Sequence, residues 1–248
     1  MQARRSRAPA GAAGEPGGPA AEFIRAHTRP AAPPLLPEIV LRLSSEEPTV
    51  LWERLESATG RADLAPPFWA YPWAGGIALA RYLLDHRQQV AGRAVLDLAA
   101  GSGLVAIAAS LAGAARVTAS DIDPVAVAAI GLNAAANGMQ LAVTTANLLA
   151  VPAPPGAVAA PGDGPAADAA LAGAELVLVG DAFYERRLAH GVLGFLGRAR
   201  AAGARVLVGD PGRTYLPSGL HEVASYAVPA WPGLEDTDVK ETVVWELR

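Results

Sequence analysis

The sequence predicts an α/β fold built on a mostly parallel sheet with helices on both faces. Five short β-type runs cover residues 94–98, 116–121, 141–147, 174–181 and 204–210. We expect helical stretches after the first, second, fourth and fifth runs, and such alternation is typical of a parallel sheet. Residues 221–228 and 240–248 form two further runs without a helix, which predicts a terminal antiparallel hairpin. The complete prediction is a Rossmann-like, doubly wound seven-strand sheet.

Composition limits the chemistry that the chain can perform. With 248 residues, 52% of them hydrophobic, the chain can bury one sizeable core. The absence of cysteine excludes disulfides and a cysteine nucleophile, and the four histidines lack metal-ligand spacing, so we expect no metal site. A net charge of −4 without a basic stripe argues against nucleic acid, and no apolar run has the roughly 18 residues that cross a bilayer. We expect a soluble, monomeric, cytoplasmic protein that acts on a protein or a small molecule.

The chain divides into a tail and one domain. Residues 1–22 are rich in Ala, Gly and Pro and are predicted to be a disordered tail, although their Arg-rich start also resembles a transit peptide. The domain is expected to span 23–248, with an N-terminal extension at 23–66 and the core at 67–248. Within the core, residues 150–172 lack periodicity and are predicted to be a flexible insertion.

Two elements are predicted ahead of the first strand of the core. In the extension, alternating apolar residues are followed by a polar turn and a second apolar run, which predicts a small β-hairpin within residues 38–55. A segment rich in proline and aromatic residues then leads to a helix with an apolar face through Ile77, Ala80 and Leu84. Trp73 lies just before this helix.

The loop after the first core strand is the predicted ligand site. It lies in AVLDLAAGSGLVAIAAS, residues 94–110, and in open α/β sheets this loop approaches the ligand most closely. Gly101 and Gly103 can adopt positive φ and expose backbone amides to an anionic group. The pattern GxGxxA, with Asp121 20 residues after Gly101, also fits NAD. Asp97 favours S-adenosylmethionine, because a buried acid repels a pyrophosphate but suits the cationic end of a methionine.

The segment VLDLAAGSG resembles motif I of the seven-strand S-adenosylmethionine-dependent methyltransferases. Ala99 occupies the place of the first glycine, and alanine is compatible with the loop if its φ is negative. The resemblance implies that Asp121 binds the ribose hydroxyls and that Asn147 contacts the adenine amino group. Two other interpretations stay open, a turn-forming role for Asn147 and a helix N-cap for Asp123.

Four segments carry a more specific resemblance: FIRAHTRP (23–30), PFWAYPWAGGIALARYLLD (67–85), DAFYE (181–185) and GDPGRTYLP (209–217). Together they resemble the electron transfer flavoprotein β-subunit lysine methyltransferase family, over nearly everything from residue 23 onward. The resemblance implies a methyltransferase that uses S-adenosylmethionine and acts on lysines of the electron transfer flavoprotein β-subunit. A ribosomal-protein lysine methyltransferase is the main alternative. A NAD-dependent oxidoreductase and a catalytically silent S-adenosylmethionine-binding module are the others.

The fourth strand of the core ends at the predicted catalytic residues Asp181, Phe183 and Tyr184, at the edge that faces the donor's methyl group in this architecture. A lysine has a pKa near 10.4 and reacts only as the free amine, and a neighbouring carboxylate raises that pKa. We therefore expect Asp181 to orient the ammonium or to accept its proton through water. Tyr184 is expected to hydrogen-bond the amine, and Phe183 to line the channel for its alkyl chain. The alternatives are that Asp181 caps the following helix and that the two aromatic residues pack in the core.

Five further residues have predicted or alternative roles near the donor and the substrate. Trp73 is expected to form a wall of the donor site, and Gly75 to offer a helix N-terminal amide to the donor's carboxylate. Trp69 and Tyr71 either pack in the core or contact substrate. Arg213 follows a turn and has no evident partner in the sequence, so it is either a surface residue or a substrate-recognition residue.

Overall fold

The computed structural model describes the chain except for residues 1–16, 151–168, 232–233 and 235–236. The predicted tail at 1–22 and the predicted insertion at 150–172 therefore lie largely outside the described residues. Where the tail prediction can be compared, its boundary is wrong, because helix α1 (Pro19–His27) starts within it. Proline is well tolerated in the first turn of a helix, where its missing amide costs nothing. None of the described helices has the length and hydrophobicity to span a membrane.

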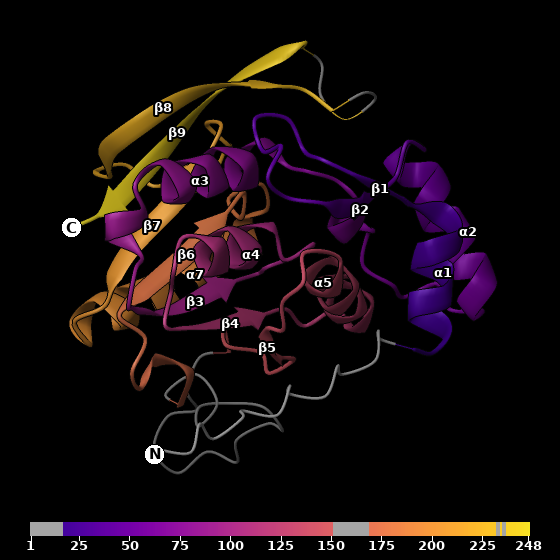
Figure 1. Ribbon diagram of the computed structural model, residues 1–248, viewed down its shortest axis with the longest axis horizontal. Helices are drawn as coiled ribbons and strands as arrows, with labels where there is room; N and C mark the ends of the chain where they lie inside the picture. The colour runs from indigo at the N-terminus through magenta and orange to yellow at the C-terminus, as the bar shows by residue number, and fades with distance from the viewer. Residues whose placement is uncertain (1–16, 151–168, 232–233, 235–236) are drawn as a thin grey trace, which may run out of the picture.

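One sheet of seven strands forms the centre of the molecule, in the order β5-β4-β3-β6-β7-β9-β8 (Figure 1). The strands are β3 (Ala94–Leu98), β4 (Arg116–Ser120), β5 (Ala142–Thr144), β6 (Leu176–Gly180), β7 (Arg205–Asp210), β8 (His221–Pro229) and β9 (Val239–Leu247). The first five strands of this order, β5, β4, β3, β6 and β7, pair in parallel with their neighbours. Strand β9 pairs antiparallel with β7 and with β8. The predicted seven-strand sheet with its terminal hairpin is confirmed. The parallel strands end at one edge, where ligands bind in folds of this type.

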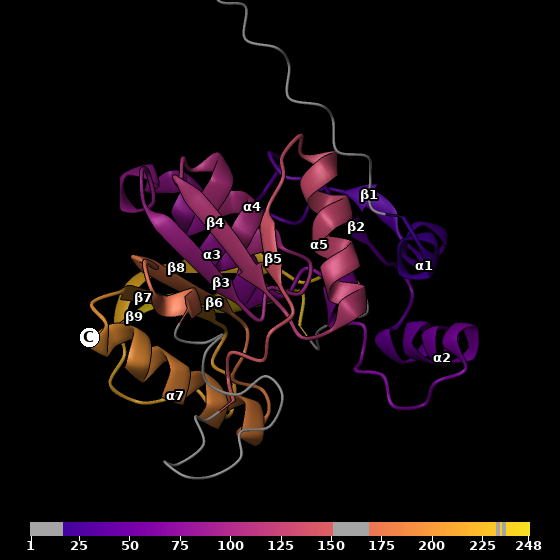
Figure 2. The same cartoon turned by 90° about the horizontal axis from the view of Figure 1, so that it is seen from below.

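Helices cover both faces of this sheet. Helices α3 (Ala74–Asp85) and α4 (Leu104–Leu111) pack on one face, with α5 (Pro124–Ala136) beside β5, and α7 (Arg186–Ala201) packs on the other (Figure 2). The alternation within β6 shows how the sequence serves both layers. Leu176 and Leu178 belong to the apolar cluster of α3 and α4, whereas Val177 and Val179 belong to that of α7.

The prediction of a helix after the fifth core strand is wrong. Residues 211–220, between β7 and β8, form turns without helix. Pro211 and Pro217 lack amide donors, and Gly212 and Gly219 adopt φ of 88° and 84°. These residues favour turns over a continuous helix.

The hairpin predicted within residues 38–55 is wrong, because only its first strand forms. That strand, β2 (Leu41–Leu43), pairs antiparallel with β1 (Arg29–Ala31), which lies ahead of the predicted range. The run expected to form the second strand forms helix α2 (Pro48–Thr59) instead. The helix begins at a proline, buries Leu51 and Leu55 at a spacing of i and i+4, and ends at Gly60 in the left-handed region.

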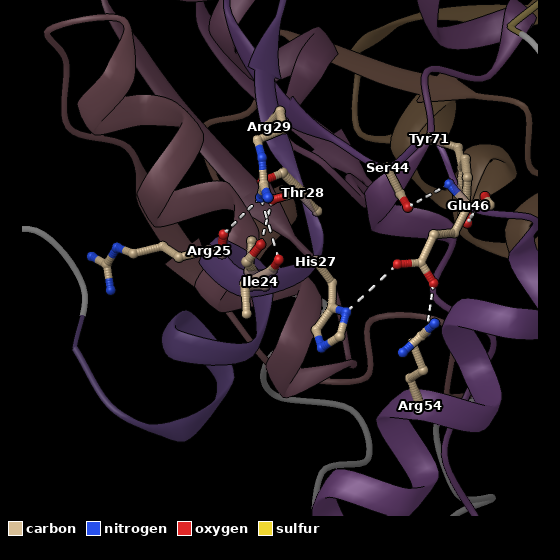
Figure 3. A network of polar contacts seen from close by, with 10 residues as sticks. Ile24, Arg25, His27, Thr28, Arg29, Ser44, Glu46, Arg54 and Tyr71 are labelled. Carbon is tan, nitrogen blue, oxygen red and sulfur yellow. Dashed lines mark hydrogen bonds and ion pairs between the residues drawn. The ribbon is translucent and has the colours of Figure 1, made fainter.

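Polar contacts connect the extension internally and to α5. The Glu46 carboxylate pairs with His27 of α1 at 3.7 Å and with Arg54 of α2 at 2.7 Å, and the Tyr71 hydroxyl donates to the Glu46 carbonyl (Figure 3). Fully buried Asn133 of α5 accepts a hydrogen bond from the backbone of β2. The extension is therefore attached to the core through side-chain hydrogen bonds as well as apolar packing.

Glycines bring the start of α3 into backbone contact with the sheet. A Cβ atom on Gly75 would lie 2.3 Å from the carbonyl oxygen of Gly209 in β7, and one on Gly209 would lie 2.1 Å from the Gly75 carbonyl oxygen. A Cβ on Gly180 would lie 2.9 Å from Gly76 Cα. Such separations exclude any side chain, since protein interiors are close-packed. These glycines set the distance between α3 and the ends of β6 and β7.

We predict that Gly209→Ala lowers the free energy of unfolding by about 2–3 kcal/mol, because the new methyl group would overlap the backbone of α3. The matched control is Gly197→Ala on α7, where a Cβ meets nothing within 4 Å. That control should raise the free energy of unfolding by about 0.5–1 kcal/mol. Urea denaturation measures both values. Equal stability of the two variants would refute the close contact.

Candidate functional site

The glycine loop between β3 and α4 has the conformation that its sequence predicts. Gly101 and Gly103 adopt φ of 53° and 79°, in the left-handed region that favours glycine. A Cβ on Gly103 would lie 3.3 Å from the side chain of Ile130, so this glycine is also required by packing. A Cβ on Gly101 would meet nothing within 4 Å, which leaves space beside the loop for a ligand.

Ala99 does not have the negative φ under which an alanine was expected to fit this loop. Its φ is +55°, not negative, so the alanine occupies a left-handed conformation next to the glycine loop. A side chain in this region costs roughly 1–2 kcal/mol relative to the right-handed conformation. The side chain is exposed, so no packing contact in the interior compensates this strain.

Asp97 is buried at the end of β3, as predicted. Its Oδ2 accepts a hydrogen bond from the amide of Ala106 in α4 at 2.9 Å. Burial raises the pKa of Asp97 to about 8, the charge of Asp121 adds to the increase, and the Ala106 hydrogen bond opposes it. At neutral pH a nearby cation would favour the ionised form of this carboxyl, so the position suits a positively charged ligand group.

Asp121 and its neighbours form the second acidic position, after β4. The Asp121 carboxylate accepts hydrogen bonds from the amides of Gly101 at 2.8 Å and Asp123 at 3.0 Å, and burial raises its pKa. Asp123 caps α5 by accepting from the Val125 amide at 2.8 Å, which confirms the N-cap interpretation. Between the two acids, Ile122 is 65% exposed, an apolar surface that the sequence analysis missed.

Asp181 follows β6 and is held from two sides. Its Oδ2 accepts a hydrogen bond from the Gly75 amide at 2.7 Å, and its Oδ1 accepts from Nε of Arg213 at 2.6 Å. The residue is buried and has a φ of 58°. The Gly75 amide, predicted to receive the donor's carboxylate, is therefore engaged by Asp181. Arg213 is not a lone surface arginine, and its guanidinium also lies 5.8 Å from the centre of the Trp73 ring.

Asp210, which the sequence analysis did not single out, supports this ion pair. Its Oδ1 accepts hydrogen bonds from the amides of Gly212 and Arg213, both at 2.7 Å. Asp210 is fully buried at the end of β7, and burial raises its pKa to about 6, with a further contribution from the Asp181 charge. The turn that presents Arg213 is therefore anchored by a buried carboxyl group.

Three aromatic rings pack edge to edge and reach Arg213, the partner of Asp181, and we call them the aromatic row: Tyr184, Phe68 and Trp73. The Phe68 ring lies edge-on to Tyr184 at 5.3 Å and to Trp73 at 5.5 Å, and the Trp73 indole donates to the Phe68 carbonyl. Tyr184 is 44% exposed, yet partial burial and the charge of Asp121 raise its pKa to about 12. Tyr184 thus keeps its proton at neutral pH, and Phe68 is a member that sequence reasoning missed.

Four other predicted or candidate residues lie away from this centre. Phe183 is fully buried in the apolar cluster under α7, which favours a packing role over lining a channel. Trp69 and Tyr71 are also buried and pack with the extension, so the packing interpretation is confirmed for both. Asn147 is exposed, and its Oδ1 accepts from the Leu149 amide at 3.1 Å, as in a turn. Its adenine contact stays a prediction.

Comparison with known proteins gives a family model and several relatives. The model described as Ribosomal protein L11 methyltransferase (PrmA) matches residues 78–157. The electron transfer flavoprotein beta subunit lysine methyltransferase of Rattus norvegicus is 36% identical over 224 residues, which cover 86% of this chain and 78% of the relative. The Xenopus laevis protein of that name is 36% identical over 236 residues, 91% of this chain and 86% of the relative.

Other matches are more limited. A ribosomal protein L11 methyltransferase of Pseudomonas aeruginosa (strain LESB58) is 53% identical, but over 53 residues, 21% of this chain and 18% of that protein. Among solved structures, a ribosomal protein L11 methylase from Lactobacillus delbrueckii subsp. bulgaricus covers 75% of this chain and 82% of its own at 18% identity, with a TM-score of 0.43.

We predict that Ala99→Gly raises the free energy of unfolding by about 0.5–1 kcal/mol, because glycine adopts the positive φ without steric cost. The strain exists without ligand, so the Kd for S-adenosylhomocysteine should change by less than about threefold. Urea denaturation and calorimetry measure the two quantities. Ala135→Gly, at an exposed position of α5, is the control and should lower stability by about 1 kcal/mol. Destabilisation by Ala99→Gly would contradict the strain.

Proposed function

The chain belongs to the electron transfer flavoprotein β-subunit lysine methyltransferase family, and from that membership we propose that its substrate is the β-subunit of an electron transfer flavoprotein. It is an S-adenosylmethionine-dependent protein-lysine methyltransferase. When bound, S-adenosylmethionine supplies a methyl group attached to a positively charged sulfonium.

The acids and glycines at the ends of β3 and β4 fit the donor. Asp97 is a buried carboxyl that a cationic amino group would hold in its ionised form. Asp121 would accept hydrogen bonds from ribose hydroxyls, and the exposed side chain of Ile122 would cover the apolar face of a purine. The space beside Gly101 admits a ligand close to the backbone.

The fixed position of the Asp181 carboxylate is the observation that supports a lysine as the methyl acceptor. This carboxylate is fixed by the Gly75 amide and by Arg213, so its orientation is set before substrate arrives. Such preorganisation aligns a nucleophile without a cost at the moment of reaction. In our proposal Asp181 orients the amine, and the protonated hydroxyl of Tyr184 accepts a hydrogen bond from it. Phe183 then acts only through packing, as support for the residues on either side.

The aromatic row suits a lysine side chain. A lysine has a long apolar stem and a charged head, and the stem prefers apolar surface while the head remains near polar groups. Tyr184, Phe68 and Trp73 present that surface, and Arg213 lies over the Trp73 ring while it binds Asp181. A cationic head is also attracted to aromatic faces. The row therefore gives a protein lysine a path to the end of β6.

A ribosomal protein remains the second candidate substrate, because the matching family model bears that description. The model covers residues 78–157, which include the glycine loop and Asp121 but neither Asp181 nor the aromatic row. That segment carries donor binding, which methyltransferases of different specificity have in common. Other relatives align over most of the chain, including Asp181 and the aromatic row, and these relatives favour the flavoprotein subunit as the substrate.

We predict that the purified protein transfers labelled methyl groups to lysines of the flavoprotein β-subunit and not to ribosomal protein L11. Asp181→Ala should lower kcat by about 10²-fold or more, because the group that orients the amine is lost. Its Kd for S-adenosylhomocysteine should stay within about threefold of the wild type. Mass spectrometry identifies the modified lysines, and calorimetry gives the affinity.

The matched control is Asp63→Ala, since Asp63 is an exposed aspartate of the extension paired with Arg61. This variant should methylate at the wild-type rate. Modification of the ribosomal protein alone would replace the proposed substrate, and undiminished turnover by Asp181→Ala would refute the role of Asp181.

The raised pKa of Asp97 makes both stability and donor binding depend on pH. The unfolded chain loses this proton near pH 4, whereas the folded protein keeps it to about pH 8. The folded state therefore binds one more proton over this range, so the stability that Asp97 contributes is full below about pH 4 and is lost as pH rises to about 8. A bound cationic amino group favours the carboxylate. The affinity for the donor should then rise as pH increases toward 8.

We accordingly expect the affinity for S-adenosylhomocysteine to be higher at about pH 8 than at about pH 6, with proton release on binding near pH 7. Titration calorimetry in two buffers of different ionisation enthalpy measures this release. Asp97→Asn should bind more weakly at about pH 8 and lose most of the pH dependence, while Asp63→Asn should behave as wild type. A wild-type affinity independent of pH would show that Asp97 is already ionised.

A further inference from the structure

A carboxylate beside a reacting lysine poses an electrostatic problem. The amine must be unprotonated for its lone pair to react, and a free lysine near neutral pH is almost entirely protonated. A bare carboxylate at this position would stabilise the ammonium and raise the pKa of the lysine further. Asp181 would therefore hold the substrate in its unreactive form unless its own charge were balanced by another group.

Arg213 is placed to balance that charge. Its Nε donates to Asp181 Oδ1 at 2.6 Å, where the Asp181 side chain is 5% exposed and that of Arg213 is 21% exposed. The Arg213 amide is tied to Asp210, and its guanidinium lies over the Trp73 ring. Charge-assisted hydrogen bonds of this kind gain strength in partly buried surroundings. The arginine is thus fixed through both its backbone and its side chain.

We propose that Arg213 is a positioning residue that neutralises Asp181 toward the substrate, so that Asp181 orients the lysine amine without stabilising its protonated form. The proposal rests on the proposed function, since it takes Asp181 to face the amine. A carboxylate oxygen has more than one acceptor site, so an oxygen already bonded to Arg213 or to the Gly75 amide can still accept from the amine.

The charges around the site make this balance necessary. The strand ends contribute three acidic groups, Asp97 in β3, Asp121 after β4 and Asp210 at the end of β7, and Glu185 follows Tyr184 beyond β6. The start of α3 contributes the Gly75 amide and no ionisable side chain. The phenol of Tyr184 responds to this field. Burial is the main cause of its raised pKa, the charges of Asp121, Glu185 and Asp181 raise that pKa further, and the charge of Arg213 opposes them.

The test compares Arg213→Gln with the wild type in kcat measured from about pH 6 to about pH 10. Removing the guanidinium should move the rising limb of the profile about one unit toward higher pH. The kcat near pH 7.5 should then fall about tenfold, while the plateau at high pH stays within about threefold of the wild type. The Kd for S-adenosylhomocysteine should not change.

Two further variants complete the comparison. Arg213→Lys retains the positive charge, so its midpoint should match the wild type even if a less precise geometry lowers its plateau. Arg200→Gln makes the same change in net charge at an exposed position in the last turn of α7, and its profile should be unaltered. If Arg213→Gln fails to fold, the midpoint of Arg213→Lys decides, and an alkaline shift there overturns the proposal.

The outcomes separate this inference from the proposed function. A uniform loss of activity at every pH in Arg213→Gln would show a structural role and overturn the electrostatic one. An unchanged profile would overturn it as well. A wild type that methylates neither the flavoprotein subunit nor the ribosomal protein would overturn the proposed function itself, and this result is read from the wild-type reactions alone.

Discussion

The backbone contact between α3 and the ends of β6 and β7 is the constraint on which the rest of the site depends. Gly75 and Gly209 approach so closely that neither can carry a side chain. This approach brings the Gly75 amide to Asp181, whose backbone amide donates to the Gly209 carbonyl at 2.9 Å. Helix N-terminal amides favour negative groups, so the helix stabilises the carboxylate that it reaches. Packing and electrostatics are therefore set by the same pair of glycines.

Four carboxyl groups lie at the ends of adjacent parallel strands, and their surroundings assign them different tasks. Asp97 has one amide partner and a pKa of about 8, so a nearby cation would favour its ionised form. Asp121 receives two amides, which hold its oxygens toward the glycine loop. Asp181 is paired with Arg213, and Asp210 anchors the turn that carries this arginine. Burial of several acids at one edge is costly, and each is offset by a different donor.

Local sequence patterns predicted the sheet well, because strands buried on both faces form nearly continuous apolar runs, and β3 begins and ends where expected. Patterns could not predict contacts between distant segments. Arg213 and Asp181 are 32 residues apart and meet only because β6 and β7 are neighbours in the sheet. The positive φ of Ala99 is equally a property of the closed loop, since alanine by itself favours negative φ. Phe183 likewise packs in the apolar cluster under α7, a contact between segments that the local pattern does not indicate.

The N-terminal extension and the glycine loop are joined through one buried side chain. Asn133 of α5 accepts a hydrogen bond from the Arg42 amide in β2 at 2.8 Å and donates to the Ser102 carbonyl in the glycine loop at 2.8 Å. A buried amide that satisfies both partners fixes their separation, because breaking either bond leaves a polar group unpaired. The extension also packs against the segment that holds Trp69 and Tyr71. Helix α5 therefore contacts both the segment leading to the aromatic row and the glycine loop.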